Sequence, residues 1–112
     1  MASVDDLWLV DFGDPYPGKP APLRPALVIG PAEAFGPTFP FVIVTPLTTT
    51  HRALSLHVEV GATPMTGLDE TSYIQCELIR SVSRNRLVHR LGAIESDVSH
   101  EVVTVIKTLL GY

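Results

Sequence analysis

The chain is poor in cysteine, in long apolar runs and in positive charge, and each shortage excludes a class of protein. A single cysteine among 112 residues excludes an internal disulfide framework and fits a reducing compartment. The longest apolar runs, such as 41–44, are far too short to span a bilayer, and residues 1–6 lack the basic and apolar segments of a secretory signal. We therefore expect a cytoplasmic protein that does not associate with membranes.

The shortage of basic residues, eight Lys and Arg against twelve Asp and Glu, gives a net charge of −4. Taken alone, this charge argues against a nucleic-acid partner. The distribution is uneven, however, because residues 79–91 contain four arginines and no acid. An acidic chain can still have one basic face. From charge alone, pairing of these arginines with acids elsewhere is the favoured interpretation.

What the chain does contain is a globular composition, 46% hydrophobic and 18% charged, which predicts one domain over residues 1–112. Apolar or alternating segments predict strands at 7–12, 26–29, 41–44, 54–60, 73–79 and 87–94. Five of the ten prolines fall within 14–25, which predicts a long stiff loop there. Pro46 is predicted to end the part of its strand that can be central in a sheet.

The C-terminal segment predicts a helix, because apolar residues recur there at helical spacing: Val98, Val102, Val105 and Leu109. Ser96 or Ser99 is the expected N-cap, and Gly111 the expected C-terminal glycine. The fold class that follows is mainly β with a C-terminal helix (α+β). Its sheet is expected to be small, antiparallel and strongly curved, or a partly closed barrel.

Four segments, in this order, resemble the MazF/PemK (Kid-like) family of toxin endoribonucleases of type II toxin–antitoxin systems. They are Leu-Trp-Leu-Val-Asp-Phe at 7–12, Leu-Arg-Pro-Ala-Leu-Val-Ile at 23–29, Val-Thr-Pro-Leu-Thr-Thr-Thr at 44–50 and Cys-Glu-Leu-Ile-Arg-Ser-Val at 76–82. Each motif alone is common, but their order and spacing are specific. The resemblance implies an SH3-like homodimer that cleaves single-stranded RNA or mRNA at short sequences. It also implies a cognate MazE-like antitoxin.

By position, Arg24 matches the family's arginine at the scissile phosphate and Thr48 its hydroxyl residue. RNA supplies its own nucleophile, the 2′-OH, so the enzyme must move protons and stabilise charge on the phosphoryl oxygens. A guanidinium stays charged and presents several donors, which suits Arg24 to that charge, and Thr48 can donate another hydrogen bond. Both residues can instead be ordinary ends of strands, in which a threonine satisfies local backbone groups.

The proton-transferring residues are less well determined by the sequence. The resemblance makes Glu77 the candidate general base, although an ion pair with Arg80 explains the same carboxylate. Where some members of the family have an arginine as general acid, this chain has Gln75, so the acid is unassigned. His57 is interpreted as an ordinary surface residue and Cys76 as a small core residue.

Further residues are candidates for contact with the RNA through charge, hydrogen bonding or stacking: Lys19, Thr49, His51, Arg52, Arg80, Arg84 and Arg86. No grouping of His, Cys, Asp and Glu has the spacing of metal ligands, and no glycine-rich phosphate loop is present in the sequence. We therefore expect no metal and no cofactor, and a reaction that proceeds without a metal.

Two alternatives stay open at this level. One is a CcdB-like inhibitor of DNA gyrase, which shares the fold and cleaves nothing, but which needs no arginine–threonine pair. The other is a catalytically inactive relative that only binds antitoxin. Gln75 and a loop at 18–23 that is shorter than in many members of the family keep this second alternative open.

Overall fold

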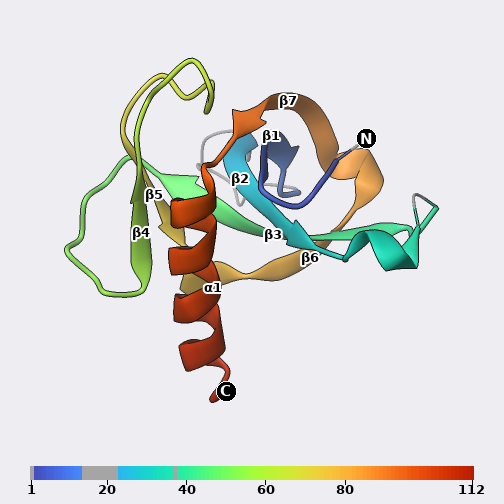
Figure 1. Cartoon of the computed structure of the whole chain (residues 1–112). Coiled ribbons are helices and arrows are strands. Elements are labelled where there is room, and N and C mark those ends of the chain that lie inside the picture. Colours follow the sequence, from blue (N-terminus) through green and yellow to red (C-terminus); the bar gives the residue numbers. More distant parts are fainter. Residues whose placement is uncertain (1, 14–22, 37) are drawn as a thin grey trace.

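The computed structural model describes residues 2–13, 23–36 and 38–112 and contains seven strands, one α-helix and three short 3-10 helices (Figure 1). The strands are β1 (Asp6–Asp11), β2 (Leu23–Gly30), β3 (Phe41–Thr48), β4 (His57–Val60), β5 (Ser72–Gln75), β6 (Arg80–Ser83) and β7 (Leu87–Ala93). The 3-10 helices are η1 (Glu33–Phe35), η2 (Cys76–Leu78) and η3 (Arg84–Arg86), and the α-helix is α1 (Ser96–Leu109).

The strands form one antiparallel sheet in the order β4-β5-β3-β2-β1-β7, with β6 pairing with β3 beside this path. Strand β3 is the centre, because β2 pairs along one side of it and β6 and β5 share the other. Strands β4 and β7 end the path, so the sheet is open. The predicted fold class, mainly β with a C-terminal helix and a curved antiparallel sheet, is confirmed.

Two apolar cores hold the sheet together. The first contains Leu7, Leu27, Leu47 and Ile74, and α1 packs against it through the fully buried Val102. The second contains Val10, Val28, Val44 and Val82. Residues of β2 alternate between the two cores, as the two-residue period of a strand requires. Figure 1 shows α1 standing beside β4.

Two strands extend through prolines that the sequence interpretation treated as breaks. Strand β3 continues past Pro46 to Thr48, which corrects the expectation that its central part ends there. Pro46 lies where the ladder on one side of β3 passes from β6, which pairs with 41–44, to β5, which pairs with 47–48. A residue without an N–H is tolerated at such an interruption. Likewise, β2 begins at Leu23, so Arg24 lies in a strand and not in a loop.

Two predicted strands are shorter than expected. Only 57–60 of the alternating segment 54–60 pairs with a neighbour, and the strand predicted over 73–79 ends at Gln75, where η2 begins. Cys76 is fully buried in the first core, as predicted, and burial raises the pKa of its thiol to about 11. Glu77 is therefore the middle residue of η2 and not part of a strand.

The helix is confirmed, but its N-cap is Glu95, and neither predicted serine caps it. Ser99 lies inside the helix and donates to the carboxylate of Asp5. At the other end, Gly111 has φ +82° and the amides of residues 111 and 112 donate back to the last turn, which is a Schellman ending. Within the described residues, no helix is long and apolar enough to cross a membrane.

Gly92 on β7 lies so close to the neighbouring chain that a Cβ atom there would overlap the carbonyl oxygen of Met65. The amide of Ala93 donates to the same carbonyl at 2.9 Å, which fixes this approach. We predict that Gly92→Ala lowers the free energy of unfolding by about 1–3 kcal/mol or more, because backbone must move. Chemical denaturation measures this change. Gly61→Ala is the control, since its Cβ would meet its nearest neighbour at 3.8 Å. Equal losses in both variants would contradict the prediction.

Candidate functional site

Arg24 and Thr48 meet where β2 and β3 run side by side. The two strands are paired as Ala26 with Pro46 and Leu27 with Thr45, and the same register continued by two residues sets Arg24 opposite Thr48. Residues that face each other across an antiparallel pair lie on the same face of the sheet. A guanidinium nitrogen of Arg24, Nη2, also donates to the carbonyl of Leu47 at 2.9 Å, next to Thr48. The structure therefore brings together the two residues that the sequence singled out.

The charge of Arg24 is held by neutral partners. Its Nη2 donates to the carbonyl of Leu47 and to the side-chain oxygen Oε1 of Gln75. Within the described part of the chain, Arg24 makes no ion pair with a carboxylate. Partial burial lowers the pKa of the guanidinium below its usual value. The site thus presents a fixed, partly desolvated positive charge whose Nη1 and Nε have no protein partner among the described residues, an arrangement suited to an anion.

Gln75 therefore has a role that the sequence interpretation missed. The sequence comparison treated it only as a replacement for an acid that cannot transfer a proton. In the structure its side chain is mostly buried and orients Arg24, while its carbonyl accepts a hydrogen bond from the buried hydroxyl of Thr45. A neutral amide suits this position, because it fixes the guanidinium and leaves the positive charge without a counterion.

Thr48 offers a hydroxyl proton to the same place. Its Oγ1 accepts a hydrogen bond from the amide of Thr50 at 3.2 Å, which fixes the rotamer. An oxygen that accepts in this way still has its own O–H to donate. The local interaction that a strand-end threonine commonly makes is thus present, and it leaves the donor available.

Glu77 is bound by a histidine and not by Arg80. Its Oε2 lies 2.9 Å from Nε2 of His57, and the carboxylate is 30% exposed while the histidine side chain is only 3% exposed. The interpretation of His57 as an ordinary surface residue was wrong. The other ring nitrogen of His57, Nδ1, is buried without a partner among the described residues. The ion pair between Glu77 and Arg80 that the sequence allowed is not formed.

The strand register connects this pair to Arg24. His57 stands directly opposite Gln75 in the β4–β5 ladder, and Tyr73 on the same strand stands opposite Thr48 in the β3–β5 ladder. These side chains share one face of the sheet, while Ile74 and Val58 between them point into the first core. Residues of β3, β5 and β4, together with Arg24 of the adjoining β2, thus form one polar surface, which we call the β3–β5–β4 face: Arg24, Thr48, Tyr73, Gln75, His57 and Glu59.

The other predicted RNA contacts are dispersed. His51 is exposed and stacks on Tyr73, with ring centroids 4.9 Å apart, so it borders the β3–β5–β4 face. Thr49 and Arg52 are exposed in the segment after β3. Arg80 pairs with Val44, nearer the middle of β3, and its guanidinium lies 5.4 Å from the ring centroid of Phe12. Lys19 lies outside the described residues.

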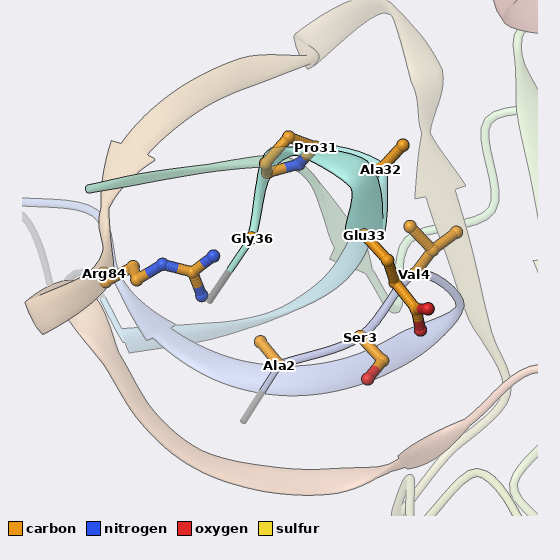
Figure 2. A pocket seen from close by; sticks show the side chains of 8 residues that line it. All are labelled: Ala2, Ser3, Val4, Pro31, Ala32, Glu33, Gly36 and Arg84. Atoms are coloured by element: carbon orange, nitrogen blue, oxygen red, sulfur yellow. The ribbon is translucent and has the colours of Figure 1, made fainter. Parts of the chain in front are cut away.

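Two of the predicted arginines are engaged elsewhere. Arg86 lies 3.7 Å from the carboxylate of Asp11, in an exposed ion pair. Arg84 donates to the carbonyl of Phe39 and lies beside the start of β3, whereas Thr48 is at the other end of that strand. Figure 2 shows Arg84 pointing into a separate pocket, between residues 2–4 and the turn at 31–36. The structure does not bring Arg84 together with Arg24.

Among residues 2–13, 23–36 and 38–112, no group of three or more His, Cys, Asp or Glu side chains is placed to hold a metal ion. His57 and Glu77 therefore have no third His, Cys, Asp or Glu near them, among the described residues, with which to hold a metal. This face can bind an anion through Arg24 and Thr48. The pair of His57 on β4 and Glu77 on η2 lies beside it and offers a carboxylate.

Comparison with known proteins places the chain in one family. Residues 4–110 match the family model described as PemK-like, MazF-like toxin of type II toxin–antitoxin system. The chain belongs to this family. A curated relative, the probable endoribonuclease MazF of Mycolicibacterium smegmatis, is 31% identical over 94 residues, which are 83% of each chain. The family predicted from the four sequence motifs is thereby confirmed. Membership of this family disfavours the CcdB-like alternative.

Solved structures of MazF proteins have the same fold. MazF of Deinococcus radiodurans superimposes with a TM-score of 0.80 at 24% identity, over 99% of this chain and 97% of that one. The MazE–MazF complex of the same organism gives a TM-score of 0.81 at 24% identity, over 98% and 96%. A mycobacterial endoribonuclease in complex with its cognate antitoxin gives 0.80 at 22% identity, over 99% and 96%.

Burial of His57 against Glu77 predicts a large contribution to stability. His57→Ala removes a buried ring and leaves the carboxylate without its partner. We expect the free energy of unfolding to fall by about 2–4 kcal/mol, as for other large-to-small substitutions in cores. His89→Ala, at an exposed position on β7, is the control and should change stability by less than about 0.5 kcal/mol. Urea denaturation of both variants checks the prediction, and similar values for the two would refute it.

Proposed function

We propose that this chain is an endoribonuclease toxin that cleaves single-stranded RNA, including mRNA, by attack of the 2′-OH on the adjacent phosphorus. The observation that carries the proposal is Arg24: a partly buried guanidinium oriented by two neutral acceptors, beside the hydroxyl of Thr48. The family and the name of the curated relative support the same activity.

We propose that Arg24 and Thr48 carry out the charge-stabilising part of the reaction, which their geometry supports. As the 2′-oxygen attacks, negative charge grows on the non-bridging phosphoryl oxygens. The free nitrogens of Arg24 donate to one such oxygen, and the hydroxyl of Thr48 to another. Donors that are fixed before the reaction stabilise this charge without reorganising during it. Because Leu47 and Gln75 already hold Arg24, its orientation does not depend on the substrate.

Glu77 is our proposal for the general base that accepts the 2′-OH proton. Its carboxylate is partly exposed, and His57 fixes one of its oxygens. A carboxylate held in this way keeps its second oxygen free to accept a proton. The leaving 5′-oxygen must be protonated in turn, and we propose that a water molecule supplies this proton. This scheme uses only protein side chains and the nucleophile of the RNA itself, so we propose that it proceeds without a metal.

The partners follow from the same proposal. We propose sequence-specific cleavage, a homodimer as the active form and neutralisation by a cognate MazE-like antitoxin, in line with the family and with the MazE–MazF complexes that share this fold. Arg80 and Arg52 are available to contact the RNA backbone. A cytoplasmic location, where mRNA is found, stays a prediction.

The decisive measurement is cleavage of a mixed-sequence single-stranded RNA in EDTA. The wild-type protein should leave a 2′,3′-cyclic phosphate and a 5′-OH. Arg24→Ala should lower the rate by at least about 10²–10³, the usual effect of removing one preorganised donor. Arg90→Ala is the control and should keep full activity. Arg90 is an exposed arginine that pairs with Asp6 and lies on β7, at the end of the strand order far from β4 and β5. Undiminished cleavage by a folded Arg24→Ala protein would exclude this assignment, and inhibition of DNA supercoiling with intact RNA would favour a gyrase inhibitor.

The proposed role of Glu77 is tested separately with Glu77→Gln, which keeps a hydrogen-bond acceptor for His57 but removes the base. The rate should fall by about 10²–10⁴, the usual contribution of general acid–base catalysis. Glu70→Gln, at an exposed position outside the β3–β5–β4 face, is the matched control. An undiminished rate in Glu77→Gln would assign the base to another group.

A further inference from the structure

A pocket of about 170 Å³ opens beside the Arg24–Thr48 site, and the reaction scheme above does not use it. Its walls come from the segment after β3, from β4 and β5, and from α1. The residues that matter for the argument are His51, His57, Glu59, Tyr73 and Glu101. Strand register places the pocket next to the phosphate site, because Tyr73 stands directly opposite Thr48. Side chains in such a pair have Cβ atoms about 4.5–5.5 Å apart.

One wall of this pocket is a ready stacking surface. The rings of His51 and Tyr73 lie nearly parallel, at 17° and 4.9 Å between centroids. The ring of Tyr73 is half-buried and packs against the imidazole of His51, which is itself exposed. A planar ring that stacks on His51 would therefore meet a surface that is already held in place, which reduces the entropy lost on binding. Stacking of this kind binds every base and distinguishes little between them.

The polar groups of the pocket outside the stacking wall include two carboxylates, which are hydrogen-bond acceptors. Glu59 and Glu101 contribute two carboxylates, and neither has a basic partner among the ion pairs of the described residues. The side chain of His57 is only 3% exposed, and its Nδ1 has no hydrogen-bond partner among the described residues. Buried polar atoms nearly always have partners, so this atom marks a place where a partner is missing.

A pocket with a stacking wall and two carboxylates selects its occupant by charge and by donors. Two carboxylates repel a phosphate group, which excludes the RNA backbone. Adenine, cytosine and guanine each present an exocyclic amino group, whereas uracil has none, and glutamate accepts from such groups. We infer that this pocket takes the base of a nucleotide next to the scissile phosphate and selects bases with an exocyclic amino group through Glu59 and Glu101. The inference rests on the proposed ribonuclease activity and names the specificity residues of that activity.

The first experiment maps the cuts that the wild-type protein makes in a random-sequence RNA. At one position within two nucleotides of the cut, amino-bearing bases should be enriched and uracil depleted. The second uses paired synthetic RNAs in which one amino group is lost at that position. Inosine in place of guanosine removes the amino group alone, whereas inosine in place of adenosine, or uridine in place of cytidine, replaces it by a carbonyl oxygen. The wild-type protein should cleave the deaminated RNA with a kcat/KM about ten- to a hundredfold lower, as for the loss of one good base contact.

Protein variants then assign the discrimination to the pocket. In the double variant Glu59→Gln, Glu101→Gln, the ratio between the paired RNAs should fall toward one, because the amides no longer demand a donor. Glu33→Gln makes the same chemical change in the separate pocket of Figure 2 and should leave the ratio unchanged. His51→Ala should lower cleavage of both RNAs alike, since stacking does not depend on the amino group.

The outcomes separate the inference from the proposed function. If the wild-type protein cleaves RNA without this base preference, or if the double glutamine variant keeps the wild-type ratio, the inference is overturned while the ribonuclease proposal stands. If the double variant changes inhibition by the antitoxin and leaves the RNA ratio intact, the pocket binds a basic side chain of that protein, which also overturns the inference. If the wild-type protein cleaves no RNA, the proposed function fails, and the inference with it.

Discussion

The position of Arg24 depends on one constraint, the interaction of its guanidinium with two neutral oxygens, the carbonyl of Leu47 and the amide of Gln75. Each partner comes from a different strand, so the bond network joins β2, β3 and β5 at the place where these strands meet. A carboxylate partner would hold the side chain as firmly but would neutralise it. With neutral partners and partial burial, the charge is fixed and remains available to a phosphate.

The second constraint is the central strand. Strand β3 is long enough to pair with β6 at one end and with β5 at the other, and Pro46 lies at the change of partner. This arrangement places the arginines of β6 and η3 along one part of the sheet and Tyr73 beside Thr48 at the other. Only Arg80 of that group lies on the way toward the site, because Arg84 is beside the opposite end of β3.

The pair of His57 and Glu77 shows how the same sheet serves stability and chemistry. The histidine side chain is buried, and its Nε2 lies 2.9 Å from the carboxylate and holds it in place. The carboxylate itself remains partly exposed, at the border of the β3–β5–β4 face. Sequence alternation correctly put His57 on the polar face of its strand, yet it wrongly implied exposure. Burial there comes from side chains of other elements, which include the segment after β3 and α1.

The sequence by itself determined the family, the mainly β fold with a C-terminal helix and the buried Cys76, because local periodicity and ordered motifs carry that information. Through the family resemblance it also singled out Arg24 and Thr48 as candidate site residues. It misplaced the ends of β2, β3 and β5, the N-cap of α1 and the environment of His57. Those features depend on which strand pairs with which, and on residues brought together over 20 to 50 positions, as Gln75 is with Arg24. The tertiary structure alone decided that Gln75 orients the arginine and that His57 holds Glu77, since hydrogen bonds between distant strands leave no pattern in a single sequence.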